Sequence, residues 1–455
     1  MSDLSRIVKA YDVRGTVPDQ LNETVAEALG TAFVQTLGAA AGRIVLAHDM
    51  RESGPGLVAA FARGARAAGA GIVDAGLGST DLLYFASGAL DLPGAMFTAS
   101  HNPAKYNGIK LCRAGARPIG QDTGLAEIRD RAQAILDGAA PTGTATAGDT
   151  ETRNLLADYA DYLRSLVDLT GIRRLKVVVD AGNGMAGYTV PAVLGGLPLD
   201  IVPLYFELDG SFPNHEANPL EPANIVDLQA AVREHGADLG LAFDGDADRC
   251  FVVDERGEAV SPSAITALVA VRELAKHPGA TVIHNLITSR AVTEIVAEHG
   301  GTPVRTRVGH SFIKAEMAST GAVFGGEHSA HYYFRDFWYA DTGMLAALHV
   351  LAALGEQAAP LSELAREYER YHASGEINSS VDDQAARLAD VEKAYVGRDG
   401  VSVDHLDGLT INFADGSWVN LRPSNTEPLL RLNVEAPTAG GMAALRDEIL
   451  ALVRN

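Results

Sequence analysis

The sequence has little cysteine, and this scarcity excludes two classes of small stabilised domain. Cys112 and Cys250 are its 2 cysteines, and they stand far apart, each beside a strand-like run. Two isolated thiols form neither a disulfide framework nor a cluster of zinc ligands. We therefore expect both residues to be buried, reduced thiols in a cytoplasmic protein.

Positive charge is also scarce. The chain carries 37 Lys+Arg against 58 Asp+Glu, a formal net charge of −21 at pH 7. Such a field repels the phosphates of nucleic acids and of anionic membranes, so neither is an expected partner. A phosphorylated ligand must be held by a local basic cluster. With 47% hydrophobic and 21% charged residues, the chain otherwise has an ordinary globular composition, which excludes wholesale disorder.

From the sequence we expect neither a secretory signal in the first residues nor a membrane-spanning run. Residues 1–15 are charged and have no apolar core, so they do not resemble a signal peptide. Residues 181–199 are uncharged, but their glycines and prolines are incompatible with a spanning helix. We expect no membrane association.

Three segments repeat one pattern: an apolar run, a polar or glycine-containing loop, and an amphipathic helix. They begin at Arg43, Leu175 and Ala280. Continuous apolar strands followed by helices are typical of parallel sheets with both faces covered. Another stretch, 25–37, keeps helical spacing after Asn22, a candidate N-cap. These patterns predict three similar α/β domains.

The C-terminal part of the chain has a different pattern, in which short strands surround turns and are followed by a helix. This pattern indicates an α+β module. Residues 138–150 are small and polar without periodicity, as in an interdomain linker. We predict an α/β protein with three similar mixed α/β domains and a C-terminal α+β domain. The expected boundaries are 1–148, 149–252, 253–370 and 371–455.

The first chemically informative motif is TASHNP, residues 98–103, which follows an apolar run. A serine in a small turn closed by Asn-Pro is presented to ligands, so Ser100 is a candidate nucleophile or phosphoryl carrier with His101 beside it. The alternative is a simple turn serine. The following NGIK sequence brings the ammonium of Lys110 back towards this turn.

The second motif is DGDADR, residues 244–249, after the apolar LGLAF. In an extended loop, Asp244, Asp246 and Asp248 would point to one side. Clustered carboxylates repel one another unless a cation or protons compensate, and oxygen-only ligands suit Mg²⁺. The alternative is a solvated acidic turn.

Two known uses of such aspartates do not fit this sequence. An EF-hand needs glycine at the position of Arg249 and helices on both sides, but the flanking sequences are strand-like. A haloacid-dehalogenase-type phosphatase would use Asp244 as its nucleophile. That class usually has Thr or Val where Asp248 stands.

Three further motifs carry polar groups suited to a phosphorylated sugar. In RPSNTEP, the planar fork of Arg422 and the hydroxyls of Ser424 and Thr426 could clamp a phosphate, although the motif could equally be a surface turn. GGEHSAH, residues 325–331, offers a carboxylate, two imidazoles and a hydroxyl to vicinal sugar hydroxyls. KAYDVRG, residues 9–15, adds a tyrosine and an arginine.

Along the chain the five motifs follow the order KAYDVRG, TASHNP, DGDADR, GGEHSAH and RPSNTEP. Together and in this order, they resemble the α-D-phosphohexomutase family, and within it the phosphomannomutase/phosphoglucomutase branch. The resemblance spans nearly the whole chain. It implies four domains around a central cleft, a phosphoserine at Ser100 and a Mg²⁺ ion. The implied metal ligands are Ser100, Asp244, Asp246 and Asp248.

The resemblance also implies roles for the other motif residues. Those near the transferred phosphoryl group are Arg14, His101, Lys110 and Arg249, of which His101 and Lys110 could move the hydroxyl proton. The implied substrate contacts are Tyr11, His310, Glu327, Ser329, His331, Arg422, Ser424, Asn425 and Thr426. One departure is that 285–289 contains no lysine, where some bifunctional relatives have one.

The activity that the resemblance implies is an intramolecular phosphoryl transfer between mannose 1-phosphate and mannose 6-phosphate, and also between the glucose phosphates. It would pass through a hexose 1,6-bisphosphate, which also serves as activator. The alternatives are a phosphoglucosamine mutase, which usually has another residue in place of His328, and a Mg²⁺-dependent sugar phosphatase. A non-catalytic sugar-phosphate sensor is disfavoured by the presence of both Ser100 and the aspartates.

Overall fold

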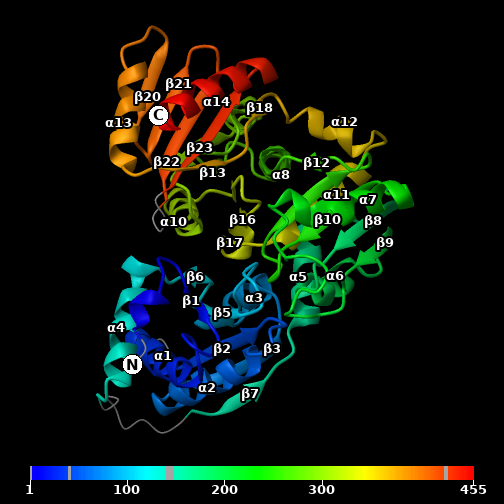
Figure 1. The fold of residues 1–455 in the computed structure, drawn as a ribbon. Coiled ribbons are helices and arrows are strands. Elements are labelled where there is room, and N and C mark those ends of the chain that lie inside the picture. The colour runs from blue at the N-terminus through cyan, green and yellow to red at the C-terminus, as the bar shows by residue number, and fades with distance from the viewer. Residues whose placement is uncertain (1–2, 39–41, 140–147, 425–428, 455) are drawn as a thin grey trace. The chain divides into compact units, whose positions relative to one another are not determined.

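The computed structural model describes residues 3–38, 42–139, 148–424 and 429–454, with the elements labelled in Figure 1. The chain divides into two compact units. The first unit comprises Met1–Val260 and Ser329–Ser362, and the second comprises Ser261–His328 and Glu363–Asn455. The helix α12 (Leu361–Arg366) carries the chain from one to the other.

The first unit begins with a mixed sheet in the order β1-β5-β4-β2-β3-β7, with β6 paired to β5. Its strands are β1 (Val13–Thr16), β2 (Arg43–His48), β3 (Gly71–Leu77), β4 (Gly94–Phe97), β5 (Tyr106–Arg113), β6 (Arg117–Pro118) and β7 (Thr150–Thr152). Strand β2 is parallel to β3 and β4, whereas β5 is antiparallel to β4 and β1. The expected parallel pairing is therefore confirmed from β4 to the edge strand β7, but not at β5 and β1, because a short loop after β4 returns the chain in the opposite direction.

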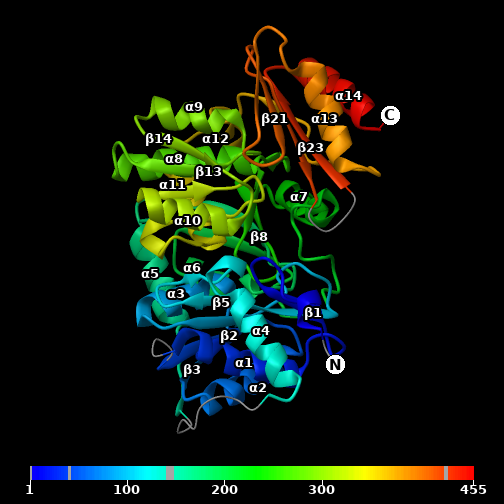
Figure 2. The same ribbon diagram turned by 90° about the vertical axis from the view of Figure 1, so that its left-hand side faces the viewer.

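Helices cover both faces of this sheet. They are η1 (Leu4–Arg6), α1 (Glu23–Leu37), α2 (Gly54–Ala67), α3 (Thr80–Leu90), η3 (Gln121–Thr123) and α4 (Leu125–Leu136). Figures 1 and 2 show α1 and α2 on one side of β2 and α3 on the other. The predicted cap of α1 is confirmed, since Asn22 Oδ1 accepts a hydrogen bond from the Val25 N–H at 3.1 Å.

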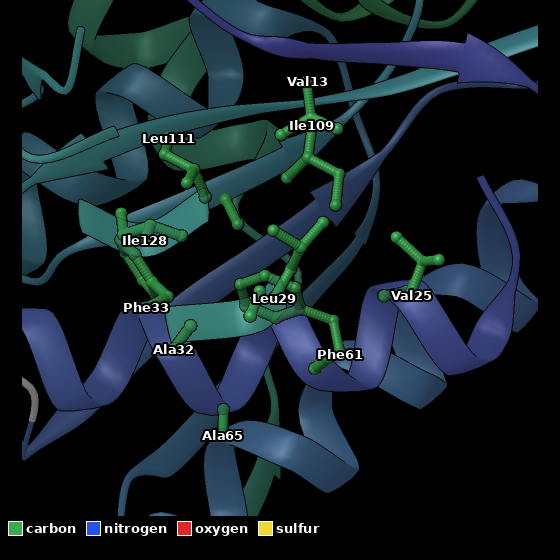
Figure 3. Close-up of a cluster of buried hydrophobic side chains, with 14 of the residues drawn as sticks. Val13, Val25, Leu29, Ala32, Phe33, Phe61, Ala65, Ile109, Leu111 and Ile128 are labelled. Atoms are coloured by element: carbon green, nitrogen blue, oxygen red, sulfur yellow. The ribbon is translucent and has the colours of Figure 1, made fainter. Parts of the chain in front are cut away.

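The apolar face of α1 forms the centre of this domain's core. Figure 3 shows Leu29 and Phe33 of α1 together with Phe61 of α2, Ile109 of β5 and Ile128 of α4. The rings of Phe33 and Phe61 lie 5.8 Å apart between centroids. Burial of these side chains fixes β4 and β5, and with them the loop that joins the two strands.

A second sheet in the first unit has the order β12-β11-β10-β8-β9. Its elements are α5 (Leu156–Leu166), β8 (Leu175–Asp180), α6 (Ala186–Leu194), β9 (Leu199–Leu204), η4 (Pro222–Ile225), α7 (Val226–His235), β10 (Leu239–Phe243), β11 (Cys250–Asp254) and β12 (Ala259–Val260). Strand β10 is parallel to β8 and antiparallel to β11. The loop 244–249 therefore joins two adjacent buried strands.

The rest of the first unit follows residue 329. It consists of β16 (Tyr332–Phe334), η5 (Arg335–Phe337), β17 (Ala340–Asp341) and α11 (Gly343–Gly355). Strands β16 and β17 are antiparallel. Across the described ranges, none of the helices has the length and apolarity needed to cross a membrane.

The second unit contains a parallel α/β segment and an antiparallel sheet. The α/β segment comprises α8 (Pro262–Lys276), β13 (Thr281–Asn285), α9 (Arg290–Glu298), β14 (Thr302–Thr306), α10 (His310–Thr320) and β15 (Phe324–Gly326). The antiparallel sheet and its helices comprise β18 (His372–Ala373), β19 (Ile377–Ser380), α13 (Gln384–Tyr395), β20 (Val401–Asp404), β21 (Leu409–Phe413), β22 (Trp418–Pro423), β23 (Leu429–Ala436) and α14 (Ala439–Arg454). Figure 2 shows α13 and α14 beside this sheet. Mixed α/β segments followed by an α+β module agree with the predicted fold class.

The predictions for the two cysteines and for the linker can also be compared with the structure. Cys112 on β5 and Cys250 on β11 are buried and not disulfide-bonded, as predicted. Of the predicted linker 138–150, residues 140–147 lie outside the described part of the chain.

The close packing of α1 on α2 yields a stability prediction. A Cβ at Gly64 would lie 1.9 Å from the Glu27 carbonyl oxygen, so Gly64→Ala should lower the free energy of unfolding by about 1–3 kcal/mol. Gly56→Ala in the same helix is the matched control. A Cβ there would meet only Glu23 Oε1, at 3.4 Å, and should cost nothing. Urea unfolding followed by circular dichroism measures both, and equal midpoints would contradict this account of the helix contact.

Candidate active site

The loop between β4 and β5 holds Ser100 in an unusual backbone conformation. Its φ is +49°, in the left-handed region that non-glycine residues rarely adopt. The Ser100 N–H donates to Thr98 Oγ1 at 2.9 Å, and its carbonyl accepts from Arg51 Nη2 at 2.9 Å. Both peptide groups of the residue are thus hydrogen-bonded within the domain, and this stabilises the strained conformation.

The Ser100 hydroxyl faces the loop 244–249. Its Oγ donates to Asp244 Oδ2 at 2.9 Å and lies 3.2 Å from His101 Nδ1. A Cβ at position 245 would lie 2.5 Å from the Ser100 carbonyl oxygen, so Gly245 is what allows the two loops to approach. The first two sequence motifs therefore meet in one place.

Three buried aspartates gather on this second loop. Ligand oxygens of Asp244, Asp246 and Asp248 lie within 4.8 Å of one another. The loop is a turn with Ala247 at φ +60°, so the expectation of an extended segment was wrong. The carboxylates converge because the turn folds back, and not because alternate residues of a strand share a face.

Two cations balance much of this negative charge. Lys110 Nζ lies 2.7 Å from Asp246 Oδ2 and 2.6 Å from Asp248 Oδ2, and Arg249 Nη2 lies 2.7 Å from Asp244 Oδ2. Burial raises the pKa of Asp244 to about 7, although Arg249 opposes the shift. Burial also acts to raise the pKa of Asp246, but Lys110, Thr80 and Arg249 together outweigh it and hold that pKa below its ordinary value. The site therefore combines strong desolvation with close charge pairing.

The donor set fits a divalent cation. Among the described residues, Asp246 Oδ1 and Asp248 Oδ1 are buried oxygens without a hydrogen-bond partner. Leaving such acceptors unpaired is unfavourable, and a hard cation that prefers oxygen ligands would satisfy them. A second group, Asp248, His331 and Asp341, also has ligand atoms within 4.8 Å. Its imidazole makes it the poorer match for Mg²⁺.

The N-terminus of α3 contacts the acidic loop and was missed from the sequence. Thr80 donates from its N–H to the Asp246 carbonyl at 3.0 Å and from Oγ1 to Asp246 Oδ2 at 2.6 Å. The two residues are 166 positions apart in the sequence. A threonine at a helix start is common, so no local signal marked it.

Arg14 and His101 complete the surroundings of the serine loop. Arg14 Nη1 donates to Asn102 Oδ1 at 2.9 Å, and Nη2 donates to Asp12 Oδ2 at 2.6 Å. His101 Nδ1 accepts from Arg249 Nη2. Burial, followed by the charges of Arg249 and Arg14, lowers the pKa of His101 to about 2, so its ring is neutral. Tyr11 lies in the segment just before β1.

Part of the predicted sugar loop lies in the first unit. His331 Nε2 is 3.8 Å from Asp248 Oδ1, and its Nδ1 is 3.0 Å from Ser329 Oγ. Arg249 and His331 also form a backbone bridge. The first unit thus brings two of the predicted substrate contacts, Ser329 and His331, together with the residues predicted around the phosphoryl group and the metal. The latter are Arg14, Ser100, His101, Lys110, Asp244, Asp246, Asp248 and Arg249.

Glu327 belongs to the second unit, where a buried hydrogen-bond network holds it. Its Oε1 accepts from Asn285 Nδ2 at 3.0 Å and from the Gly309 N–H at 3.3 Å, and Thr288 Oγ1 donates to Asn285 Oδ1 at 2.8 Å. The lysine-free stretch 285–289 therefore supports this carboxylate, a role that sequence reasoning missed. His310 begins α10, and its side chain lies outside the described part of the structure.

Arg422 lies at the end of β22 between two acidic side chains. Its Nη2 is 3.5 Å from Glu376 Oε2, and its Nη1 is 3.6 Å from Asp407 Oδ2. The Ser424 N–H donates to the Leu429 carbonyl at 2.8 Å. The predicted residues Asn425 and Thr426 fall outside the described residues.

Sequence reasoning also missed Asp49 and Arg51, which follow β2. They form a buried ion pair, with Arg51 Nε 3.2 Å from Asp49 Oδ2. The Asp-x-Arg spacing directly after a strand is the only local signal for this pair. Arg51 contacts the serine loop mostly through backbone carbonyls, and every residue has a carbonyl, so the sequence does not mark these partners.

Comparisons with known proteins extend over the whole chain. Models of the phosphoglucomutase/phosphomannomutase family match residues 5–138, 157–257 and 261–371 as alpha/beta/alpha domains I, II and III, and residues 376–452 as the C-terminal domain. Phosphohexose mutases of Xanthomonas campestris pv. campestris are 44% identical over 452 residues, 98% of each chain. The phosphomannomutase of Escherichia coli strain K12 is 41% identical over 435 residues, 94% of each chain.

A solved structure agrees with these matches. A phosphoglucomutase/phosphomannomutase family protein from Burkholderia thailandensis superposes with a TM-score of 0.89 at 33% identity, covering 100% of this chain and 98% of that one. Its similarity confirms the fold class predicted from the sequence. The chain therefore belongs to the phosphoglucomutase/phosphomannomutase family and is an enzyme of the phosphohexose mutase class, a group of isomerases.

Proposed function

We propose that this enzyme interconverts the 1- and 6-phosphates of mannose, and also those of glucose, through a phosphorylated Ser100. The observation that carries the proposal is the meeting of a conformationally strained serine with three buried aspartates, with Ser100 Oγ 2.9 Å from Asp244 Oδ2. Relatives at 41–44% identity, which are named phosphomannomutase or phosphohexose mutase, support the mannose substrate.

The proposed reaction consists of two phosphoryl transfers. In the first, the P–O bond to Ser100 Oγ breaks as a P–O bond to the free sugar hydroxyl forms, and the hydroxyl proton passes to the serine oxygen. The product is a hexose 1,6-bisphosphate. It turns over in the site, and its other phosphoryl group returns to Ser100 with the reverse proton movement. The same bisphosphate, as activator, rephosphorylates a serine that has lost its group.

The residues around Ser100 supply the electrostatic part of this chemistry. Charge builds up on the equatorial oxygens during transfer, and fixed cations stabilise it. Arg14, Lys110 and Arg249 are the proposed cations, and His101 and Lys110 are the proposed proton carriers. When bound by Asp244, Asp246, Asp248 and the Ser100 oxygen or its phosphate, Mg²⁺ supplies further positive charge at that point.

The second set of residues would hold the rest of the substrate. Glu327 is kept in place by Asn285 and Gly309, which suits a carboxylate that accepts from neighbouring sugar hydroxyls. Arg422 would bind the phosphate that is not being transferred, exchanging its carboxylate partners for phosphate. A fixed anion site of this kind accepts either end of the bisphosphate. The remaining proposed substrate contacts are Tyr11, His310, Ser329, His331, Ser424, Asn425 and Thr426.

The phosphoserine is tested by substitution and mass. Ser100→Ala should abolish turnover, because no other group in the proposal accepts the phosphoryl group. Phosphatase treatment should remove one phosphoryl group from the wild-type protein, mapped to Ser100, and none from the variant. Ser165→Ala, at an exposed serine at the end of α5, is the control and should retain both mass shift and activity. A Ser100→Ala variant with a near wild-type rate in the presence of bisphosphate would refute the proposal.

The metal site is tested by binding rather than by activity. Asp246→Asn should weaken Mg²⁺ affinity at least about tenfold, since it removes a direct charged ligand. Asp341→Asn is the matched control, because Asp341 belongs only to the alternative group with His331. The Mg²⁺ affinity of this variant should stay within about threefold of the wild-type value. Titration calorimetry on metal-free protein measures both. A larger loss in Asp341→Asn would move the metal to the alternative group.

Sugar choice tests the role of Glu327. Mannose and glucose differ only at C2, so a carboxylate that reads the C3 and C4 hydroxyls should accept both sugars. Galactose 1-phosphate inverts C4 and leaves part of the acceptor unsatisfied, so its kcat/KM should fall about ten- to a hundredfold. The three sugar phosphates are compared at saturating Mg²⁺ and bisphosphate. Equal values for galactose and mannose would exclude this account of Glu327.

A further inference from the structure

Asp49 and Arg51 form a buried ion pair where the chain leaves β2 for α2. Their exposed fractions are 0% and 2%. The Arg51 N–H donates to Asp49 Oδ1 at 3.0 Å, and Arg51 Nε donates to Asp49 Oδ2 at 3.2 Å. Each carboxylate oxygen thus accepts one bond from the same arginine, which locks the guanidinium in one orientation.

The remaining donors of Arg51 all reach the loop that carries Ser100. Nη2 donates to the carbonyls of Ser100 at 2.9 Å and Asn102 at 2.7 Å. Nη1 donates to the carbonyls of Pro103 at 3.1 Å and Tyr106 at 2.9 Å. All five guanidinium N–H groups are therefore used, and four of them hold backbone oxygens of this loop and of Tyr106, the first residue of β5.

The other peptide group of Ser100 is tied to the same pair through Thr98. The Ser100 N–H donates to Thr98 Oγ1 at 2.9 Å. Burial raises the pKa of the Asp49 carboxyl, and the Thr98 side chain acts against this shift. Thr98 thus holds the N–H side of Ser100 beside Asp49, and Arg51 holds its carbonyl side. The pair clamps the residue whose φ is +49°.

Gly210 and Phe212, which lie between β9 and η4, pack against the Asp49–Arg51 ion pair. The Phe212 ring centroid lies 5.2 Å from Arg51 Cζ. A Cβ at Gly210 would lie 2.8 Å from Arg51 Cα, so the backbone there is in close contact. Exclusion of water strengthens the ion pair and its hydrogen bonds, and it makes any unpaired group in the cluster costly.

We propose that the Asp49–Arg51 pair is a positioning device for phosphoryl transfer, which holds Ser100 in its left-handed conformation with Oγ directed at Asp244. The assignment rests on the proposed function of Ser100. Arg51 contacts the backbone around Ser100, so the pair should affect the geometry of the transfer and not the affinity for the sugar. A misplaced reacting atom lowers kcat and leaves KM nearly unchanged.

Arg51→Lys is the direct test. Lysine keeps the charge, but one ammonium cannot span four carbonyls and a carboxylate. We expect kcat to fall about a hundredfold while KM stays within about threefold. Arg256→Lys is the matched control: Arg256 makes the same two bonds to Asp254, at 3.0 and 3.2 Å, but its side chain is 56% exposed. The control should retain wild-type kinetics.

A second pair of variants decides the question even if Arg51→Lys does not fold. Thr98→Val keeps the shape of the side chain and removes the hydroxyl that accepts from the Ser100 N–H, so kcat should fall about tenfold. Thr98→Ser retains the hydroxyl and should stay within about threefold of wild type. Rescue by serine separates positioning from a general packing effect.

The decisive readout is a single turnover. Each phosphorylated variant is mixed with excess mannose 6-phosphate, and loss of the phosphoserine is followed by intact mass, with circular dichroism as the check on folding. The proposal is overturned if folded Arg51→Lys, or Thr98→Val, transfers its phosphoryl group within about threefold of the wild-type rate. A wild type that turns over without any phosphoserine would overturn the proposed function and this assignment together. A phosphorylated wild type with unaffected variants would overturn this assignment alone.

Discussion

The buried negative charge of the loop 244–249 is the constraint on which the site depends. Three carboxylates with ligand oxygens within 4.8 Å repel one another strongly in a desolvated environment. Their partners come from the first sheet's domain and from the loop itself: Lys110 on β5, Thr80 at the start of α3, the Ser100 hydroxyl and Arg249. The need to neutralise this charge therefore joins the two sheets of the first unit.

Backbone strain occurs in both loops of this site. Ser100 and Ala247 both have positive φ, although neither is glycine. Conformations of this kind persist only where the surrounding contacts outweigh their cost. For Ser100 those contacts are the bonds of Arg51 and Thr98, and the close approach at Gly245 removes space into which the loop could relax. The hydroxyl is thereby directed at Asp244 before any substrate arrives.

In the second unit, the proposed phosphate-binding residue Arg422 is held between Glu376 and Asp407. A guanidinium paired at 3.5–3.6 Å is loosely bound compared with a short bidentate pair, so in the proposed reaction a phosphate would displace these partners, although the chain has a net charge of −21. Glu327 shows the opposite arrangement, because Asn285 and Gly309 fix it from within the domain.

The amino-acid sequence by itself determined the class of fold and drew attention to the two loops of the candidate site. Apolar periodicity and the chemistry of turns are local properties, so the strand–loop–helix units, the Asn22 cap and the motifs around Ser100 and Asp244 could be predicted. Only the tertiary structure decided how the aspartates converge, since the turn at Ala247 depends on the pairing of β10 with β11. It also decided the contacts of Thr80, Asn285 and Arg51. These residues act across long sequence separations or on backbone carbonyls, and a carbonyl oxygen is the same in every residue, so no pattern in the sequence marks it as a partner.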